Sequence, residues 1–297
     1  METRNNSRII PICNKATAQQ PLEQYQKAIL FIILSILGFI VYNLSGYNSF
    51  FDGPTQFLVR VSVSATLLFA SLLTYNLLSE RNRCYLITFF GISFGFLLAN
   101  IFGNWYEYLG FTTSTIEGFA LAKFAEVVPI MLSVLVVSLA SRNSLEDILL
   151  RGGKIPRSMA LGLLVTPLAI IQYLAMGGLS VTTGIEVIVS WLPWLMLFGF
   201  SNAIMEETIF RGLFFKKYEH VLGNRLSLIQ TSLVFAILHI SLLPFMGLMI
   251  NVVFVVFLFF QGFAWGWVIQ KSDSIWGGVL AHAIADILFA IIIFGVV

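Results

Sequence analysis

The chain has 297 residues, of which 58% are hydrophobic and only 11% are charged. Soluble globular domains carry roughly 25% charged residues, so this composition excludes a soluble enzyme and a disordered chain. The net charge of +2 is too small for a nucleic-acid-binding surface. We therefore expect an all-α polytopic integral membrane protein, a bundle of eight or nine transmembrane helices, with no nucleic-acid partner.

Nine apolar segments are long enough to cross a bilayer, which takes about 20 helical residues. In chain order they cover residues 28–45, 56–78, 84–103, 118–140, 158–177, 185–215, 226–243, 246–270 and 275–296. The sixth is too long for one perpendicular crossing and contains Pro193. The polar residues 1–26 that precede these segments are predicted to form a cytoplasmic tail.

The basic residues predict the orientation in the membrane. Of the 17 Lys and Arg, all except Arg60, Lys123 and Arg211 lie in the tail or in alternate connections between the nine segments. Connections rich in Lys and Arg face the cytoplasm. The pattern therefore predicts a cytoplasmic N-terminus and a C-terminus outside.

Three motifs place ionisable side chains inside predicted spans, where a charge costs roughly 2.5–3.5 kcal/mol and indicates function. At 1.5 Å per residue, Glu206, His239, His282 and Asp286 lie about 15–22 Å along their helices from the nearest cytoplasmic cation. All four reach a similar depth, near the middle of a hydrocarbon core about 30 Å thick. The motifs are Glu206-Glu207-Thr208-Ile209-Phe210-Arg211, Phe235-Ala236-Ile237-Leu238-His239 and His282-Ala283-Ile284-Ala285-Asp286.

Helical spacing assigns the motif residues to faces. Glu207 and Arg211 are four residues apart, so they share a face and are expected to pair. Glu206 points about 100° away from Glu207 and stays free for chemistry. His282 and Asp286 are also four residues apart and share a face.

Glu-Glu-x-x-x-Arg, Phe-x-x-x-His and His-x-x-x-Asp on successive motif helices resemble the CPBP family. That family includes CAAX prenyl endopeptidases, bacteriocin-processing and immunity proteins, and the Abi proteins. The resemblance covers about residues 195–290 and implies an intramembrane endopeptidase. It divides the chain into N-terminal transmembrane helices at 27–180 and a catalytic core at 181–297.

The resemblance also implies the roles of the motif residues. Glu206 and His239 would position and activate a water molecule, while His282 and Asp286 would hold the scissile carbonyl and stabilise its oxyanion. An ionised carboxylate only accepts hydrogen bonds, so Asp286 must either be protonated or orient His282. The remaining motif positions are supports: Glu207, Arg211 and Phe235.

The same residues also suit a metal. His and Glu are zinc ligands, and Glu206, His239 and His282 would be the ligands of a Zn²⁺ ion. The family has been called metalloproteases for this reason, although the sequence contains no HExxH motif. We favour glutamate-driven hydrolysis without a required cofactor, with a metalloprotease as the alternative.

The expected partners are the lipid bilayer and a membrane-associated peptide or protein. The substrate would be a prenylated C-terminus or a leader peptide of the bacteriocin type, and the expected location is a prokaryotic cell membrane. Two alternatives stay open. One is a non-enzymatic immunity or scaffold protein on the same fold. The other is a proton-coupled transporter that uses midplane carboxylates and histidines as a relay.

Three further features have mainly structural interpretations. Lys123 and Glu126 are three residues apart in a predicted span and are expected to pair, with a role in a substrate channel as the alternative. Gly91 and Gly95 fit both G-x-S-x-G and G-x-x-x-G. Their position in the middle of a span indicates helix packing rather than a nucleophile elbow. Gln261 is predicted to be an interhelical hydrogen-bond donor.

Overall fold

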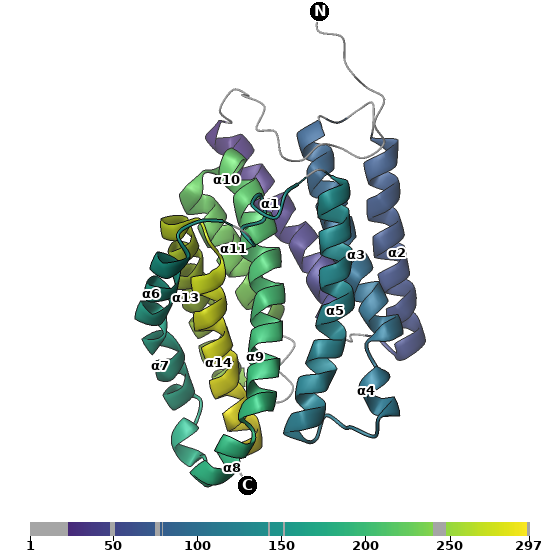
Figure 1. The fold of residues 1–297 in the computed structure, drawn as a ribbon. Coiled ribbons are helices and arrows are strands. Elements are labelled where there is room, and N and C mark those ends of the chain that lie inside the picture. Colours follow the sequence, from purple (N-terminus) through teal and green to yellow (C-terminus); the bar gives the residue numbers. More distant parts are fainter. Residues whose placement is uncertain are drawn as a thin grey trace, which may run out of the picture.

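A computed structural model describes residues 23–47, 51–74, 78, 80–141, 143–150, 152–239 and 248–295. Every regular element in these ranges is a helix, and the helices form one bundle (Figure 1). The predicted all-α membrane bundle is confirmed. Most of the predicted tail at residues 1–26 lies outside the described residues.

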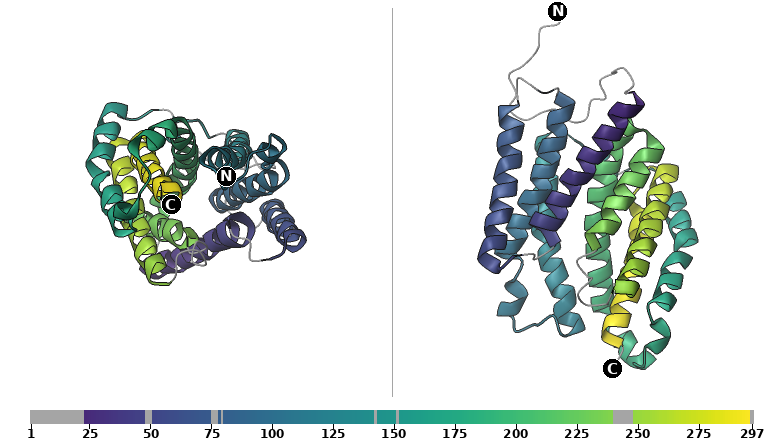
Figure 2. Two further views of the ribbon diagram at one scale, coloured as in Figure 1. Left: turned by 90° about the horizontal axis from the view of Figure 1, so that it is seen from below. Right: turned by 180° about the vertical axis from the view of Figure 1, so that it is seen from behind.

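Two groups of helices lie side by side in the bundle, and α1 of the first group crosses behind the second group to contact α11 (Figures 1 and 2). The first group contains α1 (Gln24–Phe39), the π-helix η1 (Ile40–Tyr47), α2 (Gly53–Leu73), α3 (Glu80–Phe102), the short α4 (Trp105–Tyr108) and α5 (Ile116–Ala140). The second contains α6 (Ile155–Val165), α7 (Pro167–Ala175), the 3₁₀-helix η2 (Gly178–Ser180), α8 (Ile185–Ser190), α9 (Leu192–Glu207), the π-helix η3 (Thr208–Phe215), α10 (Lys216–Leu222), α11 (Asn224–Leu238), α13 (Leu248–Ser272) and α14 (Trp276–Gly295).

Seven helical segments of the described chain are long and apolar enough to cross a membrane. The other two of the nine predicted spans are 185–215, whose ionisable motif lowers its hydropathy, and 226–243, where α11 has only 15 residues. Both still run along the bundle, and α9 packs between α5 and α14. The described chain begins and ends at opposite ends of the bundle (Figure 1), as an odd number of traversals requires.

The prediction of one helix over 185–215 is wrong in detail, because this segment forms three successive helices, α8, α9 and η3. α8 ends at Ser190, and α9 then starts with Pro193 in its first turn. Proline suits a helix start, since its missing N–H has no intrahelical partner there anyway. After Glu207 the helix continues as the π-helix η3, a rare form that is frequent at functional sites.

The connections that carry the cations lie together at one end of the bundle. Lys216 Nζ lies 3.0 Å from Asp273 Oδ1, which joins α10 to the α13–α14 connection. The backbone N–H of Lys154 donates to Ser272 O at 2.8 Å, which brings the connection before α6 to the same place. The positive-inside rule predicts that this end faces the cytoplasm.

Glycines bring α3 and α5 into close contact. A Cβ atom on Gly95 would lie 2.9 Å from the Cα atom of Ile130, and Ser133 Oγ donates to Gly91 O at 2.6 Å. Ser93, between the two glycines, is fully buried within α3 and shares a hydrogen bond with Ser64 Oγ at 2.8 Å. The G-x-S-x-G pattern is therefore a packing motif, as predicted.

Gly95→Ala should destabilise the bundle by about 1–3 kcal/mol, because the added methyl group overpacks the contact with α5. Thermal unfolding in detergent measures the effect. Gly53→Ala at the start of α2 is the control, since a Cβ there meets nothing within 4 Å. Equal melting temperatures for the two variants would contradict the close approach.

Candidate functional site

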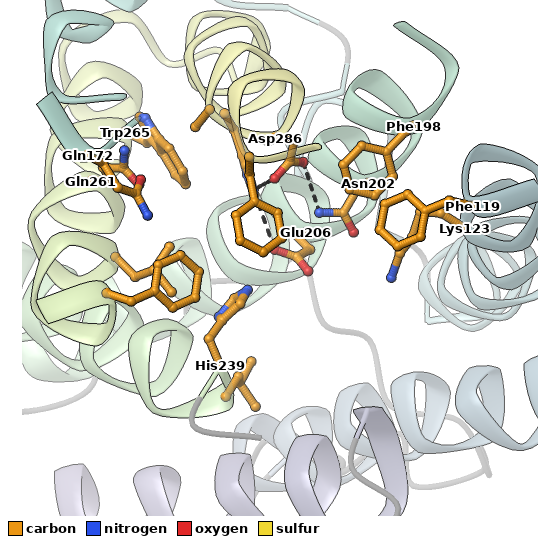
Figure 3. A pocket seen from close by; sticks show the side chains of 16 residues that line it. Phe119, Lys123, Gln172, Phe198, Asn202, Glu206, His239, Gln261, Trp265 and Asp286 are labelled. Carbon is orange, nitrogen blue, oxygen red and sulfur yellow. Dashed lines mark hydrogen bonds and ion pairs between the residues drawn. The ribbon is translucent and has the colours of Figure 1, made fainter. Parts of the chain in front are cut away.

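A cavity of about 270 Å³ lies where α5, α7, α9, α11, α13 and α14 meet (Figure 3). Glu206, His239, His282 and Asp286 all line it. These residues come from α9, α14 and the end of α11, and the structure brings them to one place. Most of the remaining wall is apolar or aromatic, as in sites that bind organic ligands.

His282 lies at the centre of the ionisable groups. Its Nε2 atom is 3.6 Å from both Glu206 Oε2 and Asp286 Oδ1, and its Nδ1 atom is 3.0 Å from Glu207 Oε1. The indole ring of Trp265 stacks on the imidazole with ring centroids 4.2 Å apart. The ring is therefore fixed by α9 on one side and α13 on the other.

The Glu207 carboxylate is fully buried and is held by Arg211. Arg211 Nη1 donates to Glu207 Oε1 at 3.0 Å and Nη2 donates to Gly262 O at 2.9 Å. A Cβ atom on Gly262 would lie only 2.9 Å from that Nη2 atom, so glycine leaves room for the guanidinium group. The predicted Glu207–Arg211 pair is confirmed.

The ion pair also sets the tautomer of His282, which the sequence did not indicate. Glu207 beside Arg211 is a carboxylate, and a carboxylate only accepts hydrogen bonds. The Nδ1 atom of His282 must therefore carry the hydrogen of this contact. This leaves Nε2 as the atom that faces Glu206 and Asp286.

A hydrogen bond to an acceptor also orients the ring of His239. Its Nδ1 atom lies 2.9 Å from the backbone carbonyl oxygen of Phe235, which can only accept. Nδ1 therefore carries the hydrogen, and Nε2 of the neutral ring is an acceptor. Figure 3 shows the ring directed toward Glu206. The Phe235 ring is fully buried against both histidines and Arg211, which agrees with a supporting position.

Asn202 is a site residue that the motif analysis missed. It lines the cavity, and its Nδ2 atom donates to Asp286 Oδ2 at 3.0 Å (Figure 3). Asn202 lies four residues before Glu206, so it shares the face of α9 that carries Glu206. That spacing, together with a polar side chain inside a predicted span, is the sequence signal that could have identified Asn202 as a site residue.

Comparison with known protein families finds a matching domain in the part of the chain that carries the motifs. Residues 188–288 match an Rce1-like domain. The matching family is described as type II CAAX prenyl endopeptidase Rce1-like, and the match confirms the resemblance to the CPBP family. No curated protein and no solved structure matches the chain. At family level, the match supports an intramembrane endopeptidase.

The N-terminal helices also contribute to the cavity, outside the Rce1-like segment. Phe119 and Lys123 on α5 and Gln172 on α7 line it. Lys123 Nζ lies 2.6 Å from Glu126 Oε2, so the predicted pair is confirmed. The alternative role of Lys123 in a substrate channel agrees with its position on the wall.

The three candidate zinc ligands all lie within the Rce1-like segment. In the described parts of the chain, no group of three or more His, Cys, Asp or Glu side chains has the arrangement of a metal centre. Glu206, His239 and His282 share the cavity without forming such a group.

Arg211→Ala should lower the free energy of unfolding by about 3–5 kcal/mol, because it leaves the Glu207 carboxylate buried without its cation. Both side chains of this pair are 0% exposed. Lys123→Ala is the control, because the side chains of Lys123 and Glu126 are 19% and 28% exposed, so the change does not leave a fully buried carboxylate without its cation. Thermal unfolding of both variants in detergent tests the difference, and equal losses would contradict the bracing role of Arg211.

Proposed function

We propose that the protein is an intramembrane endopeptidase that hydrolyses a peptide bond of a membrane-associated substrate. The observation that carries the proposal is the meeting of Glu206, His239, His282 and Asp286 in one cavity, within the segment that matches the Rce1-like family. Amide hydrolysis needs a base for water and donors for the developing oxyanion. These residues have the chemistry for both tasks.

Glu206 and His239 are proposed to activate the water. Within the described residues, Glu206 Oε2 is buried and has no hydrogen-bond partner, so it can accept a proton from a water molecule in the cavity. Nε2 of His239 is a second acceptor that positions this water. The resulting hydroxide attacks the carbonyl carbon, and the carbonyl oxygen becomes the oxyanion of a tetrahedral intermediate.

His282 is proposed to stabilise that oxyanion through Nε2. To donate from this atom the ring must be the imidazolium, a form that the carboxyl groups of Glu206, Glu207 and Asp286 stabilise electrostatically. Asp286 accepts from Asn202, which supports its role in orienting the Nε2–H of His282. Glu206 then returns its proton to the leaving nitrogen, so that a carboxylic acid and an amine are formed.

The substrate is proposed to be a prenylated, CAAX-type peptide, the class that the family description names. A cavity of about 270 Å³ is slightly smaller than the range of about 300–1,000 Å³ for ligand sites, so it accommodates only a short piece of chain. Leader peptides are the alternative class.

We also propose that the end of the bundle with Lys216 and Asp273 faces the cytoplasm.

Glu206→Gln should abolish proteolysis and leave the fold intact, because it removes the proposed base and keeps the side-chain shape. The measurement compares membrane-proximal peptide termini in cells that carry the wild type or the variant at matched expression. Glu186→Gln, the same change at an exposed position of α8, is the control. Identical termini in all three strains would favour the scaffold alternative, and Glu206-dependent proton-coupled flux in proteoliposomes would favour the transporter.

Metal removal should leave the activity unchanged if Glu206 acts as the base without a metal. The assay uses purified protein and a farnesylated, internally quenched CAAX-type peptide, before and after treatment with a chelator. Elemental analysis confirms that the treated protein is metal-free. A loss of activity that Zn²⁺ restores would overturn the glutamate mechanism in favour of a metalloprotease.

A further inference from the structure

One side of α13 faces the cavity and is apolar except at a single position. Phe254, Leu258, Gln261 and Trp265 line the cavity, at intervals of four, three and four residues that place them on one helix face. Phe254, Leu258 and Trp265 are apolar or aromatic, as expected for a helix within a membrane. Gln261 is the exception, and polar side chains inside membranes usually have a function.

Gln261 lacks the partner that the sequence predicted for it. Its side chain is 1% exposed, and neither Nε2 nor Oε1 has a hydrogen-bond partner in the described parts of the chain. The prediction of an interhelical donor is therefore wrong. A carboxamide offers two N–H donors and a carbonyl acceptor, and leaving them unsatisfied away from water is unfavourable. The described part of the fold does not use these groups, so they are available to a ligand in the cavity.

The position of Gln261 indicates what that ligand contact does. Trp265, one turn later on the same face, stacks on His282, so Gln261 adjoins the catalytic centre. In Figure 3 the Gln261 carboxamide lies beside Trp265, on the opposite side of the site from Lys123 and Asn202. A chain that passes between these walls to reach Glu206 runs past Gln261.

We propose that Gln261 binds a main-chain peptide group of the substrate. Its Nε2–H donates to a backbone carbonyl oxygen and its Oε1 accepts from a backbone N–H, since a carboxamide is complementary to a peptide group. The inference rests on the proposed function, because it requires a peptide in the cavity. A contact with the main chain does not depend on the side chains of the substrate. Gln261 is therefore expected to contribute to binding affinity and to the register of the bound peptide, and not to sequence preference. It is a positioning residue that acts on substrate binding.

Gln261→Leu separates this role from a structural one. Replacing an unsatisfied buried amide by an apolar side chain of similar size should leave thermal stability unchanged or raised. Two lost hydrogen bonds should raise KM for the farnesylated CAAX-type peptide about tenfold, with kcat within about twofold of the wild type. A structural role predicts the opposite pattern, with a lower melting temperature and a reduced kcat.

Gln230→Leu is the matched control. Gln230 is also 1% exposed, and its Oε1 atom has no partner in the described chain. Its Nε2 atom makes only a long hydrogen bond of 3.5 Å to Ser35 Oγ, and it lies on α11 away from the catalytic cavity. We expect KM to stay at the wild-type value in this variant. A rise equal to that of Gln261→Leu would show that the effect comes from repacking and would overturn the proposal.

A second measurement identifies the substrate group that is bound. Ester analogues of the reporter each replace one amide N–H by an oxygen atom. At one position the ester should raise KM for the wild type but cause no further rise in Gln261→Leu. Equal effects of every ester on both proteins would overturn the main-chain contact.

The outcomes also distinguish this inference from the function on which it rests. If the wild type does not cleave the reporter and Glu206→Gln does not bind it, the proposed function with a CAAX-type substrate fails, and the inference for that substrate fails with it. If the wild type cleaves the reporter and Gln261→Leu has an unchanged KM, only the inference fails.

Discussion

The Glu207 carboxylate is the constraint on which the rest of the site depends. A charge in the middle of a hydrocarbon core has to be paired and hydrogen-bonded, and Glu207 meets this need through Arg211 and His282. Arg211 extends the network to the backbone of α13 through Gly262. One buried charge therefore fixes the relative positions of α9, η3, α13 and α14, the elements that carry most of the site.

Two adjacent glutamates are proposed to have different tasks because their surroundings differ. Glu207 is neutralised by Arg211 and serves as the acceptor for the Nδ1–H of His282. Glu206 faces the cavity, and its Oε2 atom keeps an unused lone pair. This division follows from helix geometry, since consecutive residues point about 100° apart. The same carboxyl group cannot both hold the fold together and accept a proton from water.

The sequence was sufficient for the helical class, the motif residues and the Glu207–Arg211 pair, because membrane burial makes ionisable residues conspicuous and helical spacing decides which of them share a face. The sequence was insufficient for predicting the hydrogen-bond partner of a polar side chain when that partner lies on a neighbouring helix. Asn202 and Gln261 both carry a carboxamide inside a predicted span. Asn202 donates to Asp286, whereas Gln261 has no partner in the described chain. The break between α8 and α9 and the π-helix η3 were missed because the apolar pattern runs through both.

The distribution of partners separates structural from functional polar groups in this bundle. Arg211 and Ser93 are bonded to neighbouring helices and tie them together. Glu206 and Gln261 lie on the cavity wall with unused hydrogen-bonding atoms. The proposed chemistry lies entirely within the Rce1-like segment at 188–288, whereas Phe119, Lys123 and Gln172 close the cavity from outside it. Because the N-terminal helices shape the wall but carry no residue of the proposed chemistry, we expect substrate preference to change through them while the motif residues stay the same.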